Sequence, residues 1–197
     1  MAMSHRLKPA DWKRDAAMAA ISAASTELKT KFHSVLAAGV VTAATELYLV
    51  TKDAKLATMA NELADQLCAK QFDRSMARGG FTWAGAVRSV DGDETEPTFE
   101  QAAIATGLVA AAQLARQSAD LVRYAKYRPA AVESLMFVRG LQMTPDTSSH
   151  FETGFRNRSV VGGVRASVTD SILRADATAL AINAFIRFVE SGCENQE

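Results

Sequence analysis

Two segments of this sequence would be apolar or small on every side of a helix, and they constrain the fold more than any other feature. They are residues 37–44 and 102–112, which are rich in alanine, valine and glycine. A helix without a polar face needs neighbours on most of its sides. The sequence therefore predicts an all-α fold in which some helices are enclosed by others.

The hydrophobic spacing predicts six main helices. Asp53 is a suitable N-cap for the third helix, and Pro9 suits the opening turn of the first. Pro129 removes a backbone donor, so we expect the regular part of the fifth helix to begin there. The predicted ranges are about 10–28, 34–50, 53–70, 97–116, 120–141 and 173–190.

Two kinds of helix alternate along the chain. The third helix has one apolar stripe that includes Leu56, Leu63 and Leu67, whereas Asn61 and Glu62 fall on its other side. Such a helix borders water along one face. The fifth helix has the same character, while the second, fourth and sixth are predicted to be enclosed. The pattern favours layers of inner and outer helices in a single domain over residues 1–197.

The chain also repeats itself. Residues 38–44 resemble 106–112, and each block leads through a one-sided helix to Gln71 or Gln142. A glycine pair follows each glutamine, at 79–80 and at 162–163. The helix glycines are 107 − 39 = 68 residues apart and the second glycines of the pairs 163 − 80 = 83. The predicted unit is an inner helix, an outer helix and a glycine-marked return. The first helix is then an outer one and the sixth an inner one, and the two ends of the chain could pair.

This pattern resembles the α/α toroids, the double-ring helical barrels of many glycoside hydrolases, sugar epimerases, polysaccharide lyases and terpene cyclases. The resemblance rests on residues 35–72, on Arg139-Gly140-Leu141-Gln142 and on residues 162–179. A full toroid of six hairpins needs about twice these helices, so the resemblance implies an incomplete or small ring. It further implies a carbohydrate-processing or carbohydrate-binding function, with the glycine-pair loops and inner-helix starts bordering a central cavity.

The first long loop, residues 78–96, carries an aromatic residue beside carboxylates. Trp83 is a candidate for stacking on a sugar ring, Arg88 for binding it, and Glu96 and Glu100 for general acid and base chemistry. The alternative is a solvated turn whose acids complement the start of the next helix. Asp91 and Asp93 have the spacing of a calcium loop, but the other positions do not fit one, so no metal is expected.

The second long loop, residues 143–173, gathers arginines and acids. His150, Arg165 and Arg174 are candidates for binding an anionic sugar such as a uronate, because guanidinium groups pair with carboxylates. Asp170 and Asp176 are the candidate catalytic acids here. The alternative, which we favour, is that an arginine pairs with one of these aspartates and holds the loop in place.

Charge and composition exclude several classes of function. Lysine plus arginine and aspartate plus glutamate both total 22, which argues against a nucleic-acid partner. Neither a leader nor a run of about 20 apolar residues is evident, so we expect a cytoplasmic protein without a membrane partner. Cys68 and Cys193 suggest neither a disulfide framework nor a zinc site, and no cofactor is expected.

The sequence is compatible with three functions. A carbohydrate-active hydrolase, lyase or epimerase predicts that the two long loops converge on one cavity with Trp83 on its wall. A non-catalytic helical-repeat module for protein binding or self-assembly predicts an exposed apolar patch and no convergent acids. A homo-oligomer or another partner would then complete the ring. A terpene-cyclase-like site is the weakest, because aromatic residues make up only 7% of the chain.

Overall fold

The chain is mostly helical, as predicted. The computed structural model describes residues 11–78, 81–90, 95–148 and 160–194. Within these residues two short strands, β1 (Ala77–Arg78) and β2 (Phe81–Thr82), form an antiparallel hairpin. The helices are α2 (Asp11–Thr30), α3 (Ser34–Thr51), α4 (Ala54–Ala69), α5 (Gln101–Gln117), α6 (Leu121–Gly140) and α7 (Ala175–Glu190).

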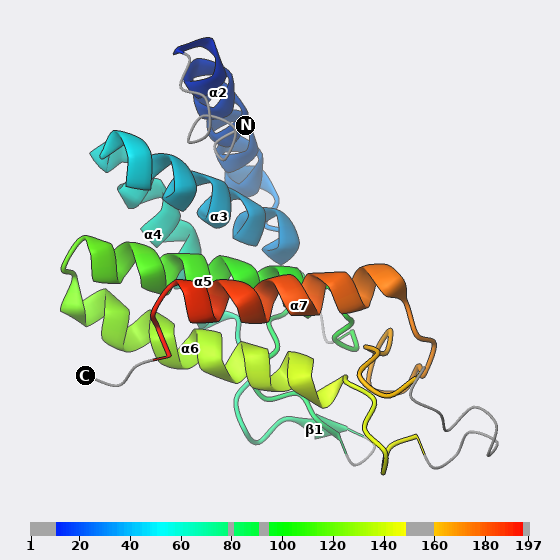
Figure 1. Cartoon of the computed structure of the whole chain (residues 1–197). Helices are drawn as coiled ribbons and strands as arrows, with labels where there is room; N and C mark the ends of the chain where they lie inside the picture. The colour runs from blue at the N-terminus through cyan, green and yellow to red at the C-terminus, as the bar shows by residue number, and fades with distance from the viewer. Residues whose placement is uncertain (1–10, 79–80, 91–94, 149–159, 195–197) are drawn as a thin grey trace.

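The helices form two layers (Figure 1). The inner layer is a row of α3, α5 and α7, which run in the same direction with α5 in the middle. Helix α4 packs on α3 and α5, and α6 packs on α5 and returns in the opposite direction. Arg187 of α7 and Glu46 of α3, which lie on either side of α5, form an ion pair. The row of inner helices is therefore curved. The tandem hairpins α3–α4 and α5–α6 are thus stacked side by side.

Helix α5 is the centre of the core. Thirteen of its residues are buried, including Leu108 and Val109. Gly107 makes this possible at the contact with α3, because a Cβ at that position would lie 2.6 Å from the Cβ of Ala38. Small residues here replace side-chain interdigitation with a close approach of two helix backbones.

The predicted alternation of enclosed and one-sided helices is confirmed for α3, α4 and α5. Val40 and Val41 are buried, whereas Glu62 on α4 is exposed and Asn61 is partly exposed. Helix α7 is the exception, since only Ala177, Ala181 and Ala184 are buried. The prediction that α7 is enclosed is wrong because it ends the row, and no described helix covers its outer side.

Pro129 does not begin the regular part of α6, contrary to our expectation. The helix runs without interruption from Leu121 to Gly140 with Pro129 inside it. An internal proline costs about 3 kcal/mol. The helix nevertheless continues because Tyr127, Ala130 and Ala131, on either side of the proline, are buried. Tertiary packing here outweighs the local penalty.

The repeat exists, but its glycine marker is a different one. Gln71 pairs with Val87, and Gln142 pairs with Val164, in matching antiparallel bridges. Gly85 and Gly162 each precede the bridged valine by two residues and have positive φ angles of 85° and 94°. The counterpart of Gly162 is therefore Gly85, and not the pair at 79–80, which lies outside the described residues. The two turns are 164 − 87 = 77 residues apart.

The two ends of the described chain do not pair. Helix α2 packs against α3 at one end of the inner row, while α7 lies at the other end (Figure 1).

On length and composition alone, α3 is apolar enough to cross a membrane, which departs from the sequence-based expectation. Half of that helix is buried inside the fold, and core helices of globular proteins pass the same test.

Candidate functional site

The two long loops meet where the inner helices begin. Thr98 pairs with Ser167 in a β-bridge, and the backbone NH of Phe99 donates to the carbonyl of Ala166 at 2.9 Å. The NH of Ser34, at the start of α3, donates to the carbonyl of Ser89 in the first loop. Loop residues therefore gather at the N-terminal ends of the inner helices (Figure 1).

Glu96 joins the two loops. Its carboxylate accepts from the backbone NH of Thr169 at 2.7 Å and from the Thr169 hydroxyl at 2.6 Å. Burial alone would raise the pKa of Glu96, but hydrogen bonds from Thr169 and Ser167 outweigh it and lower the pKa below its usual value. A carboxylate held in its charged form by these donors serves as a structural clamp.

Arg174 and Asp176 form an ion pair with two hydrogen bonds, of 3.0 Å and 2.7 Å. The hydrogen bond from Arg174 lowers the pKa of Asp176 to about 2. The Arg174 guanidinium also lies 4.8 Å from the centre of the Phe99 ring. This is the ion-pair alternative that the sequence favoured. Glu100 is exposed at the position that precedes α5.

The arginines that follow the two glycine turns hold the scaffold together. Arg165 is only 7% exposed and donates to the carbonyls of Gly140 (2.8 Å) and Leu141 (3.3 Å), at the C-terminal end of α6. Arg88, its counterpart in the first repeat, lies 4.3 Å from the centre of the Phe72 ring. Arg165 binds backbone carbonyls that would otherwise lack a helical partner.

The remaining predicted residues are buried, engaged in a local turn, or outside the described residues. Trp83 is 3% exposed and packs edge-on against Phe72, so its ring cannot stack on a sugar in this structure. Asp170 accepts from the backbone NH of Ile172 at 2.9 Å in a local turn. His150 is outside the described residues, as are Asp91 and Asp93.

Burial raises the pKa of the Cys68 thiol to about 11, so it is not a reactive thiolate at neutral pH.

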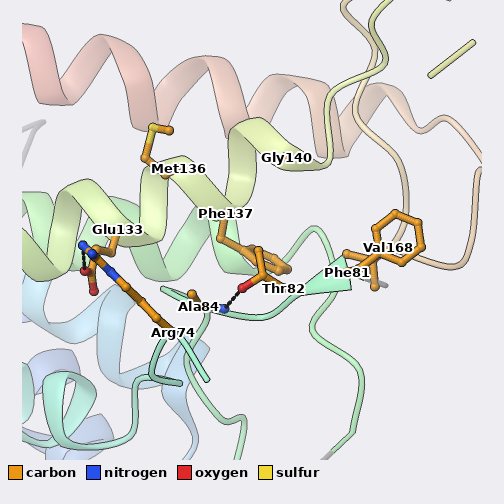
Figure 2. Close-up of a pocket in the computed structure, with 9 residues that line it drawn as sticks. All are labelled: Arg74, Phe81, Thr82, Ala84, Glu133, Met136, Phe137, Gly140 and Val168. Carbon is orange, nitrogen blue, oxygen red and sulfur yellow. Dashed lines mark hydrogen bonds and ion pairs between the residues drawn. The ribbon is translucent and has the colours of Figure 1, made fainter. Parts of the chain in front are cut away.

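An open pocket of about 650 Å³ lies between the β1–β2 hairpin and α6 (Figure 2). Phe81 and Val168 lie at one end of it, and the Arg74–Glu133 ion pair, at 3.1 Å, lies at the other. The Phe81 ring is 40% exposed and the Met136 side chain 56%. The wall thus combines an accessible aromatic ring with groups that can donate and accept hydrogen bonds. Its lining residues are Arg74, Phe81, Thr82, Ala84, Glu133, Met136, Phe137, Gly140 and Val168.

Sequence reasoning did not find this pocket. The sequence separates Arg74 from Glu133 by 59 positions, and they meet only because the β1–β2 hairpin folds back onto α6. None of the four predicted catalytic acids lines the pocket. Phe81 belongs to the first long loop, so its aromatic character beside polar residues was the one available signal.

Comparisons with known proteins add no family or activity. No protein-family model matches the chain, and neither the curated proteins nor the solved structures contain a significant match.

Proposed function

We propose that this protein is a carbohydrate-binding helical-repeat protein of the α/α-toroid type, acting on a polysaccharide or uronate-type sugar. The observation that carries the proposal is the open pocket that has the accessible Phe81 ring at one end and the Arg74–Glu133 ion pair at the other. An aromatic ring stacks on the apolar face of a sugar, and charged groups bond to its hydroxyls.

Binding is favoured over hydrolysis by the state of the candidate acids. The Glu96 carboxylate is occupied by Thr169, and the Asp176 carboxylate by Arg174. A retaining or inverting glycosidase needs two carboxyl groups facing each other across the scissile bond. Glu133 is the only acid that lines the pocket among the described residues. Catalytic roles for Glu96, Glu100, Asp170 and Asp176 stay predictions, as does a cytoplasmic location.

Titration calorimetry with an oligogalacturonide and with a neutral glucan oligomer tests the proposal. We expect one of them to bind, and Phe81→Ala to weaken its binding about tenfold, by loss of the aromatic contact. Leu121→Ala removes an exposed apolar side chain at the start of α6, outside the pocket, and is the control. Absence of binding to both sugars would refute the function, and unchanged binding by Phe81→Ala would refute the site.

A second candidate function is that of a non-catalytic helical-repeat module for self-assembly. It is favoured by the exposed apolar side chains of α7, which include Ile182 and Ile186. An exposed apolar stripe of this kind is typical of a surface that another helix covers. The two functions are compatible, since one uses the loop end and the other the edge of the helix row.

A further inference from the structure

One buried guanidinium group contacts three separate parts of the pocket wall. Arg165 is 7% exposed, and its Nη2 donates to the carbonyl of Gly140 at the C-terminal end of α6, at 2.8 Å. Its Nη1 donates to the carbonyl of Val168 in the second long loop, at 3.5 Å. The same guanidinium lies 5.8 Å from the centre of the Phe81 ring on the β1–β2 hairpin. Gly140, Val168 and Phe81 all line the pocket, and Arg165 is buried next to them.

The hairpin that carries Phe81 is too short to hold this ring in place by itself. Its two strands pair over only two residue pairs, and an isolated two-stranded hairpin is marginally stable. Trp83, which is 3% exposed, anchors the base of the hairpin in the core. The ion pair of Arg74 with Glu133 adds little, because the Arg74 side chain is 86% exposed. Phe81 lies nearer the turn than Trp83 does, so its orientation depends on the contact with Arg165.

The two repeats show that this contact is particular to the second one. The NH groups of Phe72 and Met143 each donate to the carbonyl of the residue before the bridged valine, so Met143 takes the place of Phe72. In the first repeat Arg88 lies 4.3 Å from the centre of the Phe72 ring, which is 2% exposed and does not line the pocket. With Met143 in that place, Arg165 lies instead over a ring from the other long loop. The arginine that packs on the core in the first repeat therefore packs on the pocket wall in the second.

Arg165 is also a buried cation that has no carboxylate partner among the residues that the structure describes. Arginine is seldom buried unless it is paired, because burial of a charge costs free energy. Burial accordingly lowers the pKa of Arg165 below its usual value. A neutral donor would satisfy the Gly140 carbonyl at less cost, whereas a cation is attracted to the face of an aromatic ring. The charge of Arg165 therefore points to the contact with Phe81.

We propose that Arg165 is a positioning residue of the pocket, which fixes the Phe81 ring in the orientation on which a sugar stacks. This inference rests on the proposed sugar-binding function and names the residue on which its aromatic surface depends. The Phe81 ring is 40% exposed and Arg165 only 7%, so a ligand meets the ring and not the cation. Arg165 acts through Phe81, because a ring that is already fixed loses less conformational entropy when a ligand binds.

A double-mutant cycle tests the proposal by titration calorimetry, with whichever of the oligogalacturonide and the glucan oligomer binds. Arg165→Met removes the charge and the donors, while Arg165→Lys keeps the charge but loses the planar group that stacks on a ring. We expect binding to be about tenfold weaker for Arg165→Met and about threefold weaker for Arg165→Lys. In the Phe81→Ala background, Arg165→Met should change the affinity by less than about twofold, because no ring remains to be positioned.

A matched control separates this role from a general loss of stability. Arg128→Met also removes an arginine that donates to two backbone carbonyls, those of Cys193 and Glu194, and Arg128 does not line the pocket. This variant should bind the sugar as tightly as the unmodified chain. Arg165→Lys retains a donor for the Gly140 carbonyl, so it carries the test if Arg165→Met does not fold.

A probe on the ring itself tests the positioning role without any sugar. Replacing Phe81 alone by 4-fluorophenylalanine gives a single fluorine resonance, whose chemical shift depends on the groups around the ring. Arg165→Lys should move this resonance and Arg128→Met should not. If neither sugar binds, the proposed function is refuted and the fluorine measurement still decides whether Arg165 positions the ring. An unmoved resonance, or losses of affinity that multiply in the double variant, would overturn the proposal.

Discussion

The two glycine turns offer a matched pair of substitutions that isolates one backbone contact. Gly85 and Gly162 occupy the same place in the two repeats, with φ angles of 85° and 94°. An alanine at either position is strained by about 1–3 kcal/mol, because L-residues rarely adopt this conformation. A Cβ on Gly85 would also overlap the carbonyl of Glu133, whereas the nearest atom to a Cβ on Gly162 is 3.9 Å away, on the flexible side chain of Gln142.

The strain is common to both variants, so the difference between them measures the contact with Glu133. Gly162→Ala should lower the free energy of unfolding by about 1–3 kcal/mol. Gly85→Ala should lower it by a further amount of about 1–3 kcal/mol, because the turn must shift away from α6. Urea denaturation followed by circular dichroism measures both values. Equal losses would refute the close approach of the turn to α6, and no loss in either variant would refute the positive φ angles.

Two further predictions concern the clamps at the loop end. Because the folded pKa of Glu96 is lowered, its contribution to stability should be present above its unfolded value of about 4.3 and be lost as the pH falls through the folded value. Glu96→Gln should therefore flatten the loss of stability in acid relative to the unmodified chain and to Glu62→Gln, and identical pH profiles would contradict the clamp. Arg165→Ala should lower the free energy of unfolding by about 1–3 kcal/mol, since the carbonyl of Gly140 loses its donor from the Arg165 side chain. Arg88→Ala, its counterpart on Phe72, should cost less, and urea denaturation that shows the reverse order would contradict the assigned roles.

Local composition was sufficient to predict which segments are helices. The small and apolar segments of α3 and α5 require enclosure, and Asp53 caps α4 by accepting from the NH of Lys55, as expected of an N-cap. The same reasoning failed for α7, because an apolar pattern alone does not distinguish a helix that others bury from one whose apolar side is exposed among the described residues. Pro129 was misjudged because its local penalty was visible and the packing that outweighs it was not.

The candidate site was less predictable than the fold. Arg174 and Asp176 lie two positions apart, so their pairing was foreseeable from the sequence. Glu96 and Thr169 are separated by 73 positions, and only the meeting of two loops brings them together. Trp83 was a candidate for stacking on a sugar because it is an aromatic residue beside carboxylates in a loop. The hydrophobic effect instead favours burial of this large ring, which packs against Phe72 in the core.

Amide hydrogen exchange tests most directly the claim that the fold is organised around an enclosed α5. Peptides from α5 should exchange most slowly, since α3, α4, α6 and α7 all pack against this helix. Peptides from α2, which packs mainly on α3, should exchange much faster. Exchange from α5 as rapid as that from α2 would contradict the layered arrangement of the helices.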